Sequence, residues 1–339
     1  MRLYLRISVL LLLFLALAMS AASQTVETDV AVEPYREVPF NALEPGADWT
    51  HYRWDRNHLL AWVGRPTPNR PAVALYDAEG RFVRDAIVWF PHATAVTLTD
   101  AAVTSSAGIV VSGGAGNEGG SAALFIAAID ASGHMEKIIR TNTFVPTRIC
   151  TADDGTIWSY GWDKAGAPYD MLRQFDFSTG ELNSTLRRTT FPRRGFLYYG
   201  SVPPDVALRC DHGKIVLYMT PTEEVIEYDP AAKKLTRWRW RGLPPGAQVT
   251  GFALTSDGEM FASFNDSQKG REIAGLFRFR PNTSAEAVWV PVKGMEYTRG
   301  KGLRRFDVLG NSGRDLVLRG TKSPASLNWG RIRRFSTPQ

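Results

Sequence analysis

Short segments in which apolar and polar residues alternate recur about every 50 residues along the chain, and each closes on a turn. A half-buried antiparallel strand requires this alternation, because successive side chains point to opposite faces of the sheet. Six segments share the pattern: AVALYDAEG (72–80), ALFIAAIDASG (123–133), MLRQFDFSTG (171–180), EVIEYDPAAK (224–233), GLFRFRPNTS (275–284) and GRIRRFSTP (330–338). Six repeated units of short strands predict a six-bladed β-propeller.

Each unit contains further strand-like segments on both sides of this hairpin. An inner strand comes first and runs into a glycine turn, as in ICTADDG (149–155), LRCDHG (208–213), ALTSDG (253–258) and VLGNSG (308–313). A second strand and the hairpin strand follow, and an outer strand such as KLTRWRW (234–240) ends the unit. Helical periodicity is absent after residue 23, so we predict an all-β fold of four-stranded antiparallel blades.

The two ends of the sequence predict how the ring of blades closes. The sixth unit supplies three strands and stops at Gln339, whereas the strand-like segment TDVAVEPYREVPF (28–40) has no hairpin of its own. We therefore expect residues 28–40 to form the outer strand of the last blade, which removes an exposed sheet edge. The prediction is a single propeller domain over residues 24–339.

Residues 1–23 have the pattern of a secretory signal. Arg2 and Arg6 precede an unbroken apolar run over residues 7–18, and small residues follow at 20–23. This order is typical of a signal peptide that is cleaved, here after residue 22 or 23. The apolar run is shorter than the roughly 20 residues that a membrane-spanning helix needs. We expect a secreted or periplasmic protein with no membrane contact after cleavage.

The charge of the chain bears on its partners. The formal net charge is +6, and removal of the two arginines of the signal lowers it to +4. Such a mild excess favours solubility more than binding to nucleic acid. We therefore expect no nucleic-acid partner, and we expect a monomer.

The turns of the chain resemble those of six-bladed propellers of the broad NHL-repeat and streptogramin-lyase-like kind. In that group a blade also reads as an apolar strand, an Asp-Gly turn, a second apolar strand and a hairpin that closes on Asp and Gly. The corresponding residues here are Asp154-Gly155, Asp257-Gly258, Asp77–Gly80, Asp130–Gly133 and Asp176–Gly180. The resemblance covers nearly all of the chain after the signal. It implies a fold and no chemistry, because Asp and Gly recur here for the geometry of tight turns.

Metal and catalytic chemistry have little support in the sequence. Secreted six-bladed propellers include calcium-dependent lactonases and lyases, whose sites need several oxygen ligands converging on the central channel. The acidic residues here lie mostly in turns, and the inner strands carry no ordered set of Glu, Asn and Asp. The five histidines are scattered without metal-binding spacing. We expect no metal and no cofactor, and a calcium-dependent hydrolase or lyase acting in the channel is the alternative function.

Cys150 and Cys210 are the only cysteines, and they lie in the inner-strand segments of consecutive units. They precede Gly155 and Gly213 by five and three residues, and this shared parity allows their side chains to share an orientation. A disulfide suits an extracytoplasmic compartment. Two small buried thiols are the alternative.

Because propeller strands alternate in direction, the longer connections gather on one face, which we call the long-loop face. Functional residues usually lie on such loops. The long connections, taken to include 42–54 and 142–148, are rich in arginine, which binds carboxylate or phosphate, and in aromatic rings. The candidate ligand-binding residues are Arg53, Trp54, Arg148, Arg193, Arg194, Tyr198, Tyr199, Tyr297, Arg304 and Arg305. The leading hypothesis is a non-catalytic recognition or scaffold propeller that binds an anionic or saccharide-like ligand, or another protein, on this face.

Overall fold

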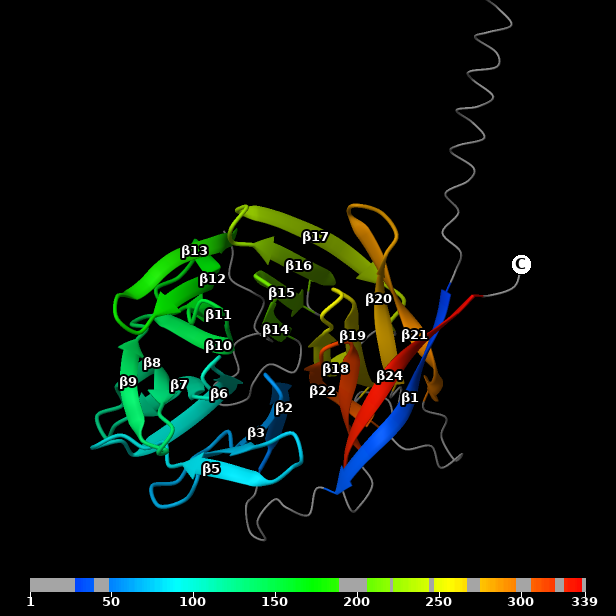
Figure 1. Cartoon of the computed structure of the whole chain (residues 1–339). Helices are drawn as coiled ribbons and strands as arrows, with labels where there is room; N and C mark the ends of the chain where they lie inside the picture. The colour runs from blue at the N-terminus through cyan, green and yellow to red at the C-terminus, as the bar shows by residue number, and fades with distance from the viewer. Residues whose placement is uncertain are drawn as a thin grey trace, which may run out of the picture.

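The structure, a computed structural model, shows blades of β-strands arranged around a central axis (Figure 1). It describes residues 28–39, 49–188, 206–219, 222–243, 247–266, 275–296, 306–320 and 326–336. Within these ranges no helix is both long enough and apolar enough to cross a bilayer. The expected signal at residues 1–23 lies outside them, so its cleavage stays a prediction.

The described strands form six blades of four strands, which confirms the predicted all-β propeller. The inner strands, nearest the axis in Figure 1, are β2 (His51–Asp55), β6 (Ala95–Val103), β10 (Phe144–Thr151), β14 (Val206–Asp211), β18 (Ala247–Leu254) and β22 (Phe306–Ser312). The second strands are β3 (His58–Trp62), β7 (Ile109–Gly116), β11 (Ile157–Asp163), β15 (Lys214–Met219), β19 (Met260–Asp266) and β23 (Asp315–Gly320). The third strands are β4 (Val73–Tyr76), β8 (Ala122–Ile129), β12 (Tyr169–Asp176), β16 (Glu224–Asp229), β20 (Gly275–Pro281) and β24 (Ser326–Ser336). The outer strands are β5 (Phe82–Ala86), β9 (Met135–Arg140), β13 (Gly180–Arg188), β17 (Lys234–Arg241), β21 (Glu286–Glu296) and β1 (Thr28–Pro39).

The ring closes as the sequence predicts. Strand β1 pairs antiparallel with β24 from Thr28 opposite Ser336 to Pro39 opposite Ser326, and it becomes the fourth strand of the sixth blade. Figure 1 shows these two ends of the described chain side by side. Val30 and Val32 of β1 are buried in a core cluster shared by the fifth and sixth blades, so the closing strand contributes apolar packing as well as ladder hydrogen bonds.

The outer edges of three consecutive blades are also joined. Strand β21 of the fifth blade pairs in parallel with β17 of the fourth and touches β1 of the sixth at Ala31 opposite Lys293. Part of the sheet edge that these blades would expose is therefore covered by a neighbouring blade.

Aromatic side chains fill the wedges between blades. Tyr218 of the fourth blade lies 5.7 Å from the ring centroids of both Trp240 and Trp289, the second of which belongs to the fifth blade. All three side chains are buried. Large rings that pack in stacked and edge-to-face pairs remove much apolar surface from water and so hold neighbouring blades together.

The Asp and Gly residues of the hairpins make turns, as expected from the sequence. Oδ1 of Asp77 accepts the backbone N–H groups of Glu79 and Arg81, each at 2.9 Å. Gly80 takes a φ of 75°, which favours glycine. Asp130 makes the corresponding bonds one blade later, so these carboxylates are engaged in the fold.

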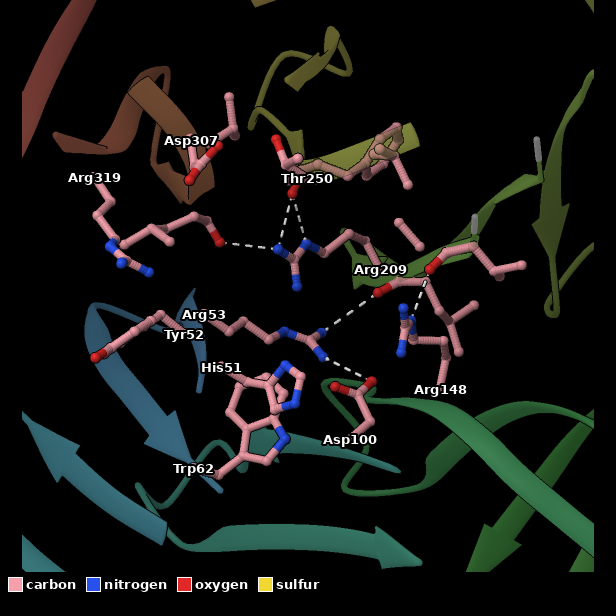
Figure 2. Close-up of a pocket in the computed structure, with 18 of the residues that line it drawn as sticks. His51, Tyr52, Arg53, Trp62, Asp100, Arg148, Arg209, Thr250, Asp307 and Arg319 are labelled. Atoms are coloured by element: carbon pink, nitrogen blue, oxygen red, sulfur yellow. Dashed lines mark hydrogen bonds and ion pairs between the residues drawn. The ribbon is translucent and has the colours of Figure 1, made fainter. Parts of the chain in front are cut away.

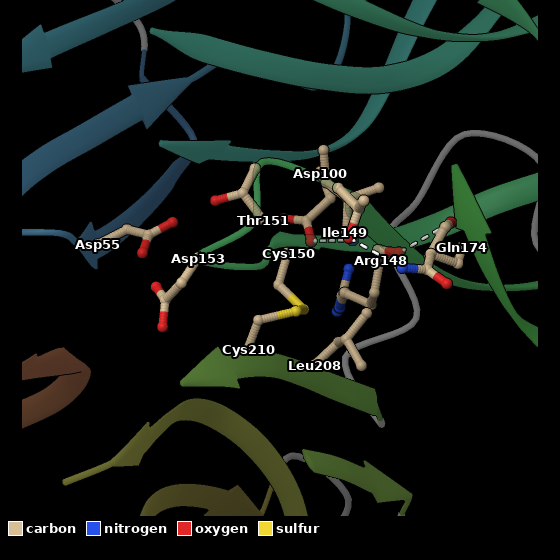
Figure 3. Close-up of a disulfide and its surroundings, with 12 residues drawn as sticks. Asp55, Asp100, Arg148, Ile149, Cys150, Thr151, Asp153, Gln174, Leu208 and Cys210 are labelled. Carbon is tan, nitrogen blue, oxygen red and sulfur yellow. Dashed lines mark hydrogen bonds between the residues drawn. A yellow bond between two sulfur atoms is a disulfide. The ribbon is translucent and has the colours of Figure 1, made fainter. Parts of the chain in front are cut away.

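A disulfide joins the inner strands of the third and fourth blades (Figure 3). It links Cys150 of β10 to Cys210 of β14, with the two Cα atoms 5.5 Å apart. Cys150 is fully buried and Cys210 is half-buried. The neighbouring inner strands therefore approach closely enough at this level to be bridged.

Candidate functional site

A cavity of about 360 Å³ lies at the centre of the ring (Figure 2). It reaches the start of β2 at His51 and the last residues of the second strands β3 and β23 at Trp62 and Arg319, so it lies toward the long-loop face, where the chain enters each blade. The charged and aromatic residues that line it are His51, Tyr52, Arg53, Trp62, Asp100, Arg148, Arg209, Phe252, Asp307 and Arg319. Apolar residues of β14, β18 and β22 complete the wall.

Irregularities in the inner strands decide which side chains reach this cavity. The pairing register shifts at one residue in each of four inner strands, and the residues skipped are Thr99, Thr147, Thr250 and Leu309. An extra residue of this kind is a β-bulge, which bends the strand and changes the direction of the next side chain. Asp100 and Arg148 directly follow two of these bulges and line the cavity.

Arg53 lies across the base of the cavity and is only 5% exposed. Its Nη1 atom donates to the carbonyl oxygens of Ile149 at 2.8 Å and Ala101 at 3.2 Å, and Nη2 donates to that of Leu208 at 3.4 Å. The carboxylate of Asp100 lies 3.5 Å from Nη1. One side chain from the first blade is thus bound to the inner strands of the second, third and fourth.

Arg209 completes this arrangement from the fourth blade. Its Nε and Nη2 atoms donate to the carbonyl oxygen of Phe252 at 3.0 and 2.8 Å, and Nη2 donates to that of Leu309 at 2.9 Å. These acceptors belong to the fifth and sixth blades, so Arg53 and Arg209 together connect all six inner strands. Nη1 of Arg209 makes no hydrogen bond within the described ranges, and Figure 2 shows it directed toward Arg53.

The cavity has a positive balance of charge. Burial, and after it the charge of Arg53, lower the pKa of Arg209 to about 9, so the guanidinium stays charged at neutral pH. Four arginines line the cavity against two aspartates, an excess of two positive charges. Fixed charges in a partly enclosed, low-dielectric site act more strongly than on the surface.

The first blade contributes an aromatic side to the cavity. The imidazole of His51 stacks on the buried indole of Trp62, with 5.2 Å between ring centroids and 25° between planes. Burial lowers the pKa of His51, the charge of Arg148 lowers it as well, and Asp100 acts in the opposite direction. His51 is therefore mostly neutral at pH 7.

Two further arginines are held at the cavity wall. Nε of Arg148 donates to the carbonyl oxygen of Val206 at 2.6 Å, across the boundary between the third and fourth blades. The guanidinium of Arg319 lies over the ring of Tyr52 at 4.3 Å from its centroid, a cation–π contact. Their charges are thus positioned on different walls of the same space (Figure 2).

The structure brings together two of the sequence-predicted ligand residues. Arg53 and Arg148 line the cavity, whereas Trp54 is 2% exposed and packs edge-on against Trp329 at 5.3 Å. All three lie on the inner strands β2 and β10, which corrects their assignment to long loops, since both strands start earlier than the pattern indicated. The remaining candidates lie outside the described residues: Arg193, Arg194, Tyr198, Tyr199, Tyr297, Arg304 and Arg305.

Several cavity residues were not foreseen from the sequence. Arg209 stands within the inner-strand segment LRCDHG, but nothing in the alternation shows that it turns into the channel. Arg319 lies one residue before the end of a second strand, and His51 starts an inner hairpin whose turn contains no glycine. Within the described residues, no three His, Cys, Asp or Glu side chains lie close enough together to hold a metal ion.

No protein-family model matches the chain, and no curated protein sequence matches it. Solved structures are similar in fold only. A glucose dehydrogenase is 13% identical, with a TM-score of 0.48 over 88% of this chain and 99% of that one. A GH74 xyloglucanase from Xanthomonas campestris is 14% identical, with a TM-score of 0.47 over 89% of this chain and 46% of that one. Hydrazine synthase of Kuenenia stuttgartiensis is 13% identical, with a TM-score of 0.47 over 82% of this chain and 78% of that one.

Proposed function

We propose that this chain is a non-catalytic recognition propeller that binds an anionic ligand in its central cavity, from the long-loop face. The observation that carries the proposal is the pair of guanidinium groups at the base of the cavity. Arg53 and Arg209 are fixed by strand carbonyls, and Nη1 of Arg209 has a donor to spare beside Arg53. An anion placed there relieves the repulsion of two like charges and accepts a charge-assisted hydrogen bond.

The same cavity is poorly suited to the alternative function, a calcium-dependent hydrolase or lyase. Calcium takes six to eight oxygen ligands, many of them carboxylates. The groups that converge on the channel here are mainly guanidiniums, and Asp100 is already bonded to Arg53 and to the backbone N–H of Ile149. A divalent cation in this space would meet repulsion from several fixed positive charges.

The proposal also includes the cellular location of the protein and the group of propellers that it resembles. The signal-like residues 1–23 and the disulfide between Cys150 and Cys210 support a secreted or periplasmic location. The Asp and Gly turns support a place among NHL-repeat and streptogramin-lyase-like propellers. The ligand would then be a small molecule of the extracytoplasmic space.

Replacing Arg209 with methionine is expected to weaken binding of inorganic sulfate by about tenfold or more, because a charge-assisted contact contributes roughly 1.5–3 kcal/mol. The measurement is isothermal titration calorimetry at low ionic strength. Arg239→Met on the exposed outer strand β17 removes the same charge far from the cavity and should leave the affinity unchanged. Because Arg209 also holds two blades, Arg319→Gln serves as a second test and should weaken sulfate binding in the same direction. Equal affinities in the parent, R209M and R319Q would place anion binding elsewhere.

Binding of sulfate is also expected to strengthen as the pH falls from 7.5 to 5. A bound anion counteracts the burial and the Arg148 charge that lower the pKa of His51. The complex therefore takes up more protons than the free protein below about pH 6.5, and linkage raises the affinity there. Sulfate stays ionised over this range. His51→Gln should flatten the dependence, and His134→Gln, in an exposed hairpin turn, should keep it. A slope that survives in H51Q contradicts this assignment.

A further inference from the structure

We infer that the ligand of the central cavity is an acidic sugar, whose carboxylate lies between Arg209 and Arg53 and whose ring rests on the His51–Trp62 stack. This inference rests on the proposed anion recognition and adds a ligand class to it. Three parts of the cavity carry it, namely the central pair of arginines, the aromatic side and an acceptor on the sixth blade.

The charged part favours a planar monoanion. Two carbonyl oxygens, of Phe252 and Leu309, fix the plane of the Arg209 guanidinium. A carboxylate accepts guanidinium donors in its own plane, which gives directional as well as electrostatic recognition. The carboxylate of Asp100 lies 3.5 Å from Arg53 and already offsets part of its charge. Arg53, Arg209 and Asp100 together carry one net positive charge, which a monoanion balances.

The aromatic part favours a ring over a short acid. The imidazole of His51 stacks on the indole of Trp62, and these two rings form one side of the cavity next to the arginines (Figure 2). A neutral imidazole backed by an indole is a rigid apolar surface, on which the C–H face of a pyranose packs.

The third part supplies a hydrogen-bond acceptor for hydroxyl groups. Asp307 of β22 lines the cavity, and Figure 2 shows it and the His51–Trp62 pair on different sides of the two central arginines. A ligand that reaches all three must carry an acid, a flat face and donor groups. The volume of about 360 Å³ lies at the small end of ligand sites, which favours a single sugar residue or the end of a chain.

The test is calorimetric titration at pH 7.5 with D-glucuronate, D-glucose, acetate and glucose 6-phosphate. We expect glucuronate to bind at least about tenfold more tightly than acetate or glucose. Acetate lacks the sugar ring, and glucose lacks the carboxylate. His51→Ala should weaken glucuronate binding more than acetate binding and so remove most of that preference, with folding checked by thermal melting. Arg209→Met should weaken both acids.

The outcomes separate the two proposals. If acetate and glucuronate bind with equal affinity, and the H51A variant changes neither of these affinities, the acidic-sugar inference is overturned while the anion site stands. If glucose 6-phosphate binds more tightly than glucuronate, the preference for a carboxylate is overturned. If no anion binds, the proposed function fails and the inference fails with it.

Discussion

Replacement of Arg53 by methionine is expected to lower the free energy of unfolding by about 3–5 kcal/mol. Methionine is also unbranched and flexible, but it is uncharged and donates no hydrogen bonds. It would leave the carbonyl oxygens of Ile149 and Ala101 without these donors and the carboxylate of Asp100 buried without its guanidinium partner. Removing one member of a buried ion pair is costly because the remaining charge stays desolvated.

Urea unfolding followed by tryptophan fluorescence measures this loss. Arg241→Met is the matched control, since Arg241 is highly exposed and its ion pair with Glu286 at 3.4 Å should contribute less than about 1 kcal/mol. Adding Asp100→Asn to R53M should recover part of the stability, because it removes the unpaired charge. A loss of stability in R53M no larger than that in R241M would show that the channel arginine does not hold the blades together.

The architecture could be predicted because it rests on repetition. Six hairpins and a missing fourth strand in the last unit leave residues 28–40 as the natural closing strand, and β1 takes that place. The first blade was the weakest part of the pattern. Its inner hairpin turns at Arg56 and Asn57, with φ values of 47° and 59°, whereas four of the other inner turns place a glycine at positive φ. A turn without glycine gives a much weaker signal in the sequence.

The site could be predicted only in part, because it depends on bulges and on distances between blades. Strict alternation assigns each side chain to one face of a strand, but an extra residue reverses that assignment beyond it. Arg148 follows such a bulge at Thr147, so its direction cannot be obtained by counting along β10. Arg53 and Arg209 meet only because the ring places the first and fourth blades across one axis, and no local pattern encodes that meeting (Figure 2).

The disulfide stabilises the same central region by a different mechanism. It joins residues 60 positions apart in the sequence, so it restricts the unfolded chain over about one blade. Cys150 directly follows Ile149, whose carbonyl oxygen receives Arg53, and Cys210 directly follows Arg209. The bridge between these two strands (Figure 3) therefore constrains them next to Ile149, which accepts a hydrogen bond from Arg53, and next to Arg209.

Loss of this bridge, in the double variant Cys150→Ala and Cys210→Ala, is expected to lower the free energy of unfolding by about 2–4 kcal/mol. Guanidinium unfolding of the variant and of the parent, with and without dithiothreitol, measures the change. The reduced parent should approach the variant, because both lack the covalent constraint, and any remaining difference reports the packing of the sulfur atoms. Thiol labelling of the oxidised, unfolded parent should find no free cysteine. A parent whose unfolding midpoint is the same with and without reductant would contradict a stabilising bridge, and it would also remove one support for a location outside the cytoplasm.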